Sequence, residues 1–155
     1  MKCYADSSFI LQLLVEDFAN EEAVHCFRRL GRPALLYSGL HTLEITNGLR
    51  LRLFAAAAMG SKARALARRQ NASAHRRLLH LSSRGTLRRV SLSFEDALTE
   101  ATALTEIHTE HIGTRSLDTL HVASALLLKA DKFLTCDERQ SLLAKRAGLP
   151  VELIG

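Results

Sequence analysis

The sequence predicts a three-layer, doubly wound α/β domain built on a five-stranded parallel sheet. Short apolar runs typical of buried strands alternate with longer amphipathic segments along the whole chain, which favours β-α-β units. Of the 155 residues, 47% are hydrophobic and 24% are charged, as in ordinary globular domains. This length provides one hydrophobic core and leaves too little chain for a second. We therefore expect a single domain over residues 1–155.

The first half of the chain predicts two strands and four helices. Cys3–Asp6 reads as a first strand, and the cluster Asp6, Ser7 and Ser8 can cap the helix that follows it. Apolar residues at helical spacing continue from Phe9 to Leu14. The other elements expected here are helices over 21–30, 41–58 and 62–81 and a strand over 34–37, with Gly60 breaking the last two helices apart.

The second half continues the alternation. We expect a short strand over 90–92 and then a helix to about residue 108, capped by Ser93 with Asp96. Helices over 116–128 and 137–147 enclose a fourth strand over 132–135, and Gly148 with Pro150 ends the last helix. Residues 151–154 close the sheet as a fifth strand. The glycine-rich phosphate loops of nucleotide-binding proteins are absent from the sequence.

Positive charge is concentrated in one stretch of the sequence. The formal net charge is +5, but residues 45–94 contain no Asp or Glu at all. The bases of this acid-free stretch are Arg50, Arg52, Lys62, Arg64, Arg68, Arg69, Arg76, Arg77, Arg84, Arg88 and Arg89. A block of this kind attracts polyanions such as nucleic-acid backbones, although a solvated helical face or an oligomer contact is the plainer explanation. We expect a basic helical arm over about residues 50–89.

The cysteines and the short apolar runs of the sequence bear on the cellular compartment. Three cysteines form no CxxC pair, and an odd number suits a reducing environment better than a disulfide framework. No secretory signal is evident, and the longest apolar run is far shorter than the roughly 20 residues that a membrane helix needs. We expect a cytoplasmic protein with no membrane partner.

Four acidic residues fall where a parallel sheet places its ligands. Asp6 follows the first expected strand, and Asp137 follows the fourth, two residues past Thr135. Glu44 lies early in the helix after the second strand, and Asp118 opens the helix before the fourth. Because ligands bind beyond the carboxyl ends of parallel strands, we expect all four side chains at one edge of the sheet.

Four ionised carboxylates gathered in this way need a partner. At about 5 Å they repel by roughly 3 kcal/mol per pair at an effective dielectric constant of about 20, so such a cluster favours a bound cation. Ligands that are all oxygen favour Mg²⁺, with Mn²⁺ as a second choice, over zinc. A divalent ion held by carboxylates suits phosphodiester hydrolysis.

Each acid also has a purely structural interpretation. Asp6 can cap its helix, Asp137 can form a capping box with Gln140, and Asp118 can interact with its helix dipole. Glu44 can be solvent-exposed. Together, however, four acids expected at one sheet edge are hard to explain as caps.

Four stretches resemble the motifs of the PIN-domain family, in the family's order and over essentially the whole chain. Tyr4–Ser8 looks like the opening motif, and Leu43–Ile45 resembles the second acidic motif. Arg115–Ala125 closely resembles the third motif, which is the most specific, and Phe133–Asp137 with the later Ala144 and Gly148 resembles the last. By size and motif wording, the sequence is most similar to VapC-type toxins of prokaryotic toxin–antitoxin pairs.

This resemblance implies a Mg²⁺-dependent endoribonuclease with a PIN-like fold, inhibited by a small VapB-like antitoxin and assembled as a symmetric homodimer. It assigns metal binding and catalysis to the same four acids, and the family relies most on the positions of Asp6 and Asp118. The family's polar residue before the last acid falls on Thr135, and its hydroxyl after the first acid falls on Ser7 or Ser8. The basic arm is long and arginine-rich for such toxins.

Other functions and residues stay open from the sequence. A non-catalytic PIN-like module that binds RNA or protein, or a DNA-directed nuclease, would share the fold. Arg115 can hold a substrate phosphate together with Thr135 and Ser8, or can form a structural ion pair. His121 is interpreted as a packed core histidine, and the His108-x-x-His111 spacing is a poor zinc site because no Cys accompanies it. We expect self-association through helices near residues 49–58 or 97–104.

Overall fold

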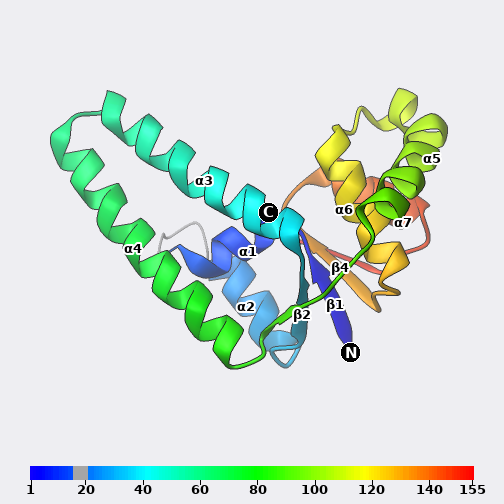
Figure 1. Ribbon diagram of the computed structural model, residues 1–155, viewed down its shortest axis with the longest axis horizontal. Helices are drawn as coiled ribbons and strands as arrows, with labels where there is room; N and C mark the ends of the chain where they lie inside the picture. Colours follow the sequence, from blue (N-terminus) through cyan, green and yellow to red (C-terminus); the bar gives the residue numbers. More distant parts are fainter. Residues whose placement is uncertain (16–20) are drawn as a thin grey trace.

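The computed structural model describes residues 1–15 and 21–155 and confirms the predicted fold class (Figure 1). Five strands form one sheet in the order β3-β2-β1-β4-β5, and every neighbouring pair is parallel. The strands are β1 (Lys2–Ala5), β2 (Ala34–Tyr37), β3 (Leu87–Arg89), β4 (Lys132–Thr135) and β5 (Val151–Leu153). The helices are α1 (Ser7–Leu14), α2 (Glu21–Arg29), α3 (Gly39–Ala58), α4 (Ser61–Ser83), α5 (Phe94–Ile112), α6 (Ser116–Leu127) and α7 (Glu138–Arg146).

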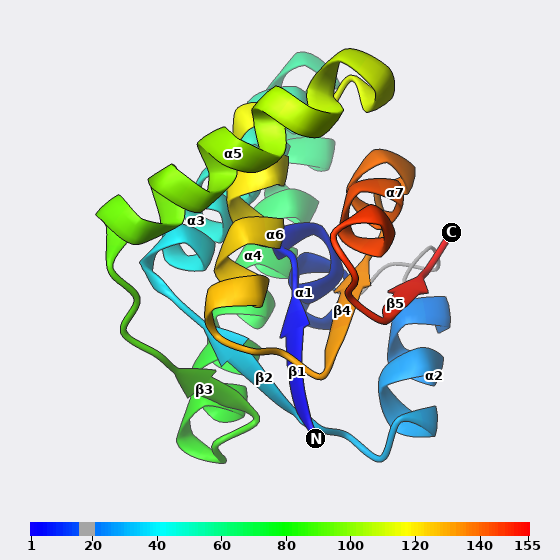
Figure 2. The same ribbon diagram turned by 90° about the vertical axis from the view of Figure 1, so that its right-hand side faces the viewer.

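Helices cover both faces of the sheet. Alternate residues of the central strands point to opposite sides, so each face has a core of its own. Cys3 and Ala5 of β1 belong to a core that they share with residues of α1–α4, whereas Tyr4 belongs to a second core with residues of α5–α7. Figures 1 and 2 show these two helical layers on either side of the strands. The central strands β1, β2 and β4 are therefore buried from both directions, which accounts for their mostly apolar character.

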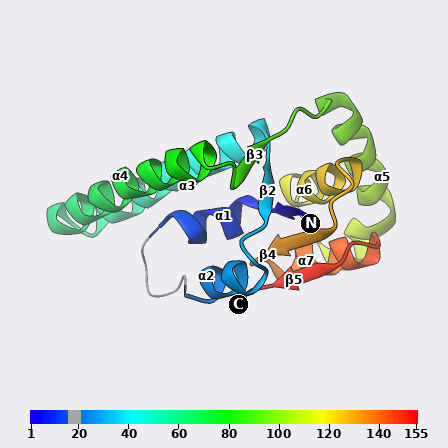
Figure 3. The ribbon, with the colours of Figure 1, turned by 90° about the horizontal axis from the view of Figure 1, so that it is seen from below.

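The basic arm is a helical hairpin. Helices α3 and α4 are in contact, extend beyond the sheet to the turn that joins them (Figure 3), and spread apart from that turn toward the sheet (Figure 1). The turn between them passes through Gly60, whose φ of +105° is a conformation that residues with a Cβ rarely adopt. Asn71 of α4 joins the two helices, since its side-chain amide donates to the Leu49 carbonyl oxygen at 2.7 Å. Arg88 and Arg89, at the end of the acid-free stretch, lie on β3.

One predicted strand is wrong in position. The third strand covers Leu87–Arg89 and not residues 90–92. Leu87 is buried, but Arg88 and Arg89 are exposed. β3 is an edge strand that pairs only with β2, so two adjacent arginines are tolerated there and hide the apolar pattern of a strand.

The structure also bears on the expectations about cysteines and membranes. Cys3, Cys26 and Cys136 are all free thiols. Within the described ranges, no helix has the length and apolar character needed to cross a bilayer.

Candidate metal and nuclease site

The candidate site lies where the strand order reverses. From β1 the chain builds β2 and β3 on one side and then crosses to β4 and β5 on the other, so β1 and β4 flank the switch point of the sheet. Asp6 follows β1 directly, and its backbone N–H donates to the Leu134 carbonyl of β4 at 2.9 Å. Asp137 follows β4 after one intervening residue. The topology thus brings the first and last acids of the predicted quartet to the same edge.

Asp6 is fully buried and held by hydrogen bonds. Its Oδ1 accepts from the Phe9 backbone N–H at 2.8 Å, and its Oδ2 accepts from the Thr135 hydroxyl at 2.8 Å. The Ser8 hydroxyl lies 2.8 and 2.9 Å from the two carboxylate oxygens. Burial raises the pKa of Asp6 above its ordinary value, and these donors act against that rise. Asp6 therefore caps α1, as one interpretation predicted, and still lies at the switch point.

A series of hydrogen bonds, through both side chains and backbone N–H groups, links Asp6 to Asp137 and Asp118. The Asp137 backbone N–H donates to the Thr135 hydroxyl oxygen at 2.9 Å, and Thr135 in turn donates to Asp6. Asp137 Oδ1 accepts from the backbone N–H of Gln140 at 3.0 Å, and the Gln140 side-chain amide donates to Asp118 Oδ1 at 3.0 Å. Asp137 thus caps α7, Asp118 completes the capping box of α6, and Gln140 bonds the first through its backbone and the second through its side chain.

Glu44 reaches the same region from α3. Its Oε2 accepts from the Ser7 hydroxyl at 2.8 Å and from His121 Nε2 in a close contact. Burial alone would raise the pKa of Glu44, but the hydrogen bonds from His121 and Ser7 outweigh that effect and hold its pKa below the ordinary value. The side chain is only 23% exposed, so its interpretation as a solvent-exposed residue is wrong.

His41 anchors the start of α3, a role that no pattern in the sequence predicts. Its Nε2 lies 2.8 Å from the Ala5 carbonyl oxygen, which can only accept, so Nε2 carries the proton. Its Nδ1 then accepts from the Ser38 backbone N–H at 3.1 Å. The imidazole therefore ties the end of β1 to the first turn of α3. Glu44 lies one turn further along the same helix.

The donor types at this edge suit a hard divalent cation. Carboxylates and hydroxyls gather there, and Cys136, the nearby sulfur, keeps its proton because burial raises its pKa to about 11. Within residues 1–15 and 21–155, however, no three His, Cys, Asp or Glu side chains lie close enough together to hold an ion. Mg²⁺ commonly uses one or two carboxylates and keeps several waters, so the residues present fit that ion.

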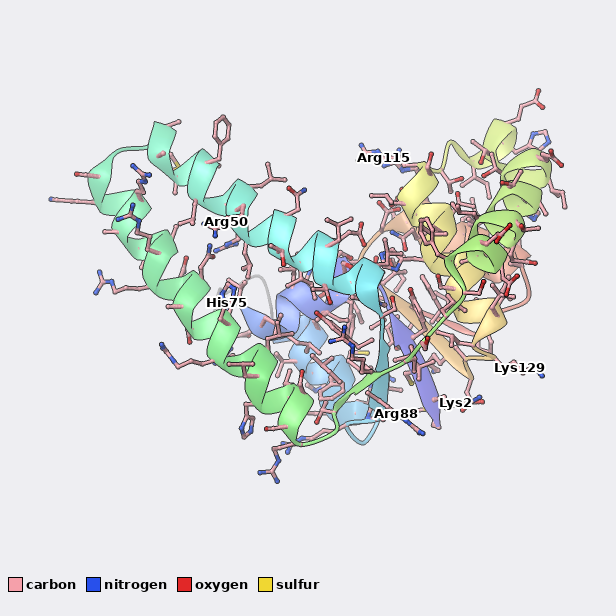
Figure 4. All side chains as sticks on the ribbon, in the orientation of Figure 1. Lys2, Arg50, His75, Arg88, Arg115 and Lys129 are labelled. Atoms are coloured by element: carbon pink, nitrogen blue, oxygen red, sulfur yellow. The ribbon has the colours of Figure 1, made fainter. Side chains whose placement is uncertain are left out.

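The predicted substrate-binding residues have different surroundings. Ser8 and Thr135 are both engaged with Asp6, and Thr135 is fully buried, so these hydroxyls hold the carboxylate in place. Arg115 is exposed at the start of α6, where its backbone N–H donates to Asp118 Oδ2 at 3.2 Å (Figure 4). Its guanidinium remains a candidate for a substrate phosphate.

Two further residues at this edge of the sheet, Gln140 and Arg139, are not predicted as site residues from the sequence. The sequence predicts for Gln140 only half of a capping box, yet its side chain bonds Asp118. Arg139 lies 3.9 Å from Asp137 Oδ2 and donates to the Gly113 carbonyl at 3.5 Å. Their positions two and three residues after Asp137, on the first turn of a helix that starts at the site, are the signal that could have identified them.

Comparison with known proteins agrees on the fold. Neither a family model nor a curated protein matches the sequence. The structure is similar to a chain of VapBC2 from Rickettsia felis, solved with a DNA fragment of its promoter, with a TM-score of 0.57, 15% identity, and coverage of 99% of this chain and 98% of that chain. It is also similar to a domain of a functionally unknown protein from Methanocaldococcus jannaschii DSM 2661, with a TM-score of 0.50, 14% identity, and coverage of 99% and 91%. At these identities the likeness is one of fold.

Proposed function

We propose that this chain is a Mg²⁺-dependent endoribonuclease, the toxin of a toxin–antitoxin pair with a small VapB-like antitoxin as its partner. The observation that supports the proposal most is that Asp6 and Asp137 follow the two strands at the β1/β4 switch point, while Gln140 bonds Asp118 and Ser7, next to Asp6, bonds Glu44. The full-length fold likeness to a chain of VapBC2 supports the toxin assignment. RNA is preferred to DNA because of the sequence resemblance.

In this proposal one or two of the four acids would hold Mg²⁺, or Mn²⁺, directly, and the others would contact it through water. The bound ion supplies Lewis-acid polarisation of the phosphate and lowers the pKa of water. The chain itself contributes orientation: Thr135 and Ser8 hold Asp6, Gln140 holds Asp118, and the α7 backbone holds Asp137. Arg115 and the arginines of the hairpin arm position the RNA backbone.

One observation favours the competing function, a PIN-like module that binds RNA without cleaving it. Asp6 is completely buried and its carboxylate is surrounded by three hydrogen-bond donors, so an ion can reach it only if one of these neighbours moves. The competing module needs no such rearrangement, and it predicts RNA binding that is indifferent to Mg²⁺.

Cleavage of a labelled single-stranded RNA, with the same sequence in DNA offered alongside, tests the proposal. We expect cleavage of the RNA that requires Mg²⁺ and is abolished by a chelator. Asp6→Asn and Asp118→Asn should each lower kcat/KM at least about a hundredfold, because losing several kcal/mol of transition-state stabilisation costs that much. Asp131→Asn is the matched control, since Asp131 lies before β4 at the opposite edge and its side-chain oxygen can still accept.

Four results would overturn parts of this proposal. Metal-independent cleavage, or full activity in Asp6→Asn, would show that the acids are not the active site. RNA binding without cleavage would favour the non-catalytic module. Cleavage of the DNA alone would replace the substrate class while keeping the site.

A further inference from the structure

A buried pair of side chains lies beneath Glu44. His121 projects from α6 and is 1% exposed, and Tyr4 of β1 is completely buried beside it. The Tyr4 hydroxyl lies 2.8 Å from His121 Nδ1, and His121 Nε2 contacts Glu44 Oε2. Three elements that are distant in sequence, β1, α6 and α3, therefore meet through one continuous hydrogen-bonded path.

Rings pack around this path and restrict its movement. Tyr4 stacks on Phe133 with centroids 5.8 Å apart and an interplanar angle of 6°. His41 packs edge-on against His121 at 5.0 Å. Because close-packed rings have few alternative rotamers, the His121 imidazole is fixed in orientation as well as in position.

The chemistry of each group determines which atom donates and which accepts in the two hydrogen bonds of His121. Oε2 of Glu44 is a carboxylate oxygen that also accepts from the Ser7 hydroxyl, so Nε2 of His121 donates to it. The Tyr4 hydroxyl lies 2.8 Å from His121 Nδ1 and carries a proton that it can donate. The His121 imidazole is thus hydrogen-bonded at both ring nitrogens, to Tyr4 through Nδ1 and to Glu44 through Nε2.

The contacts leave part of Glu44 available. The hydrogen bonds from Ser7 and His121 both end on Oε2, and in the part of the chain that the structure describes none ends on Oε1. A carboxylate that is anchored by one oxygen and partly exposed can present its other oxygen to a cation without moving.

We propose that His121 is a positioning residue that fixes the Glu44 carboxylate at the sheet edge, and that Tyr4 holds His121 in the required orientation. The proposal rests on the proposed function, since Glu44 is one of the acids assigned to the ion. It goes beyond the interpretation of His121 as a packed core histidine, which explains its burial but not its contact with Glu44.

Two amide variants separate positioning from packing. The side-chain amide of glutamine can occupy about the place of imidazole Nε2, whereas that of asparagine reaches only the place of Nδ1. His121→Gln should keep the bond to Glu44, and His121→Asn should lose it. Tyr4→Phe removes only the hydroxyl and leaves the ring stack in place.

The first measurements are Mn²⁺ affinity by calorimetry and the kinetics of RNA cleavage, with the melting temperature as a record of folding. We expect His121→Asn to weaken Mn²⁺ binding and lower kcat about 10- to 100-fold, the usual cost of losing a supporting hydrogen bond at a metal site. His121→Gln should stay within a few-fold of the unmodified chain, and Tyr4→Phe should lie between them. KM for RNA should be unchanged in all three.

A second measurement needs neither metal nor activity. The urea unfolding midpoints of His121→Asn, Glu44→Gln and the double variant form a double-mutant cycle in the metal-free protein. If His121 holds Glu44, the double variant should shift the midpoint by less than the sum of the two single shifts.

The outcomes distinguish this inference from the proposed function. Additive midpoint shifts, or a folded His121→Asn with unchanged Mn²⁺ affinity and kcat, would overturn the positioning role. Equal losses in His121→Asn and His121→Gln that follow the melting temperature would also overturn it, in favour of packing alone. Non-additive shifts in a chain that binds no Mn²⁺ and cleaves no RNA would uphold the contact with Glu44 and reject the nuclease.

Discussion

A neutral, buried histidine makes the protein sensitive to acid. Burial lowers the pKa of His41 to about 3, whereas an unfolded histidine titrates near 6.5. Between these values the unfolded chain binds one more proton than the folded chain. The stabilising contribution is therefore fully present above about pH 6.5 and is lost as the pH falls.

Chemical denaturation at pH 7 and pH 5 tests this expectation. The unmodified chain should lose about 2 kcal/mol more than His41→Gln over this interval, because a pKa difference of one unit corresponds to 1.36 kcal/mol. Glutamine keeps a donor for the Ala5 carbonyl and does not titrate. The same pH dependence in both proteins would contradict the assignment of a neutral His41.

At the scale of single residues, the sequence predicts where the acidic residues lie along the chain's strands and helices better than it predicts which side chains contact them. The acids could be placed because each one follows or precedes a strand, and strand ends are readable from local pattern. The contact between His121 and Glu44 joins residues 77 positions apart, and it depends on how α3 and α6 pack across the sheet edge. Local periodicity carries no information about such a pairing.

Helix α4 presents a row of bases on its outer side. Lys62, Arg69 and Arg76 are seven residues apart, so they lie on one face, and all three are exposed. Ala67, Asn71 and Ala74 occupy the buried face. A helix face lined with cations at regular intervals is suited to the phosphates of an extended RNA strand.

Replacing Lys62, Arg69 and Arg76 together by Gln tests this surface. We expect a higher KM for RNA, an unchanged kcat, and a slope of log(kcat/KM) against log salt that is shallower by about 2, as expected for three lost contacts to single-stranded RNA. The matched control replaces Lys129, Lys145 and Arg146, which lie at the ends of α6 and α7 away from the site; Figure 4 shows Lys129 and Arg115 at opposite ends of α6. An equal effect in both triple variants would indicate net charge alone.

At the scale of elements, the prediction failed where charge masked an apolar pattern. The strand over 132–135 agrees with β4 because its last three residues are continuously buried. β3 was placed three residues too late because Val90 and Leu92 look more apolar than Arg88 and Arg89. Pairing with β2 determines that strand, and pairing is not visible in a single edge segment.

For the whole molecule, the exposed apolar residues indicate where copies can meet. Leu43, Leu51 and Phe54 lie on α3 and are 63%, 56% and 80% exposed. Of the two surfaces predicted from the sequence, the alternative at residues 97–104 is less suitable, because Ala97, Ala101 and Leu104 are packed in the second core. The apolar face of α3 is thus the better candidate for self-association.

Light scattering coupled to size exclusion tests this prediction. We expect a dimer at micromolar concentration and a monomer for Leu51→Glu combined with Phe54→Glu, because burying unpaired carboxylates at a contact is unfavourable. Leu79→Glu, at a residue of α4 that is 70% exposed, is the control and should stay dimeric. A monomer in the unmodified chain would contradict the prediction.

The arginines of β3 also limit how molecules can aggregate. A sheet that ends in an unprotected outer strand offers its free backbone groups to the next molecule, and growth along that direction leads to fibres. Two molecules meeting along β3 would bring two copies of Arg88 and Arg89 together, and four guanidinium ions in proximity repel each other. The residues that obscured this strand in the sequence thus protect the folded protein against sheet extension, and leave contact through helices as the favoured route.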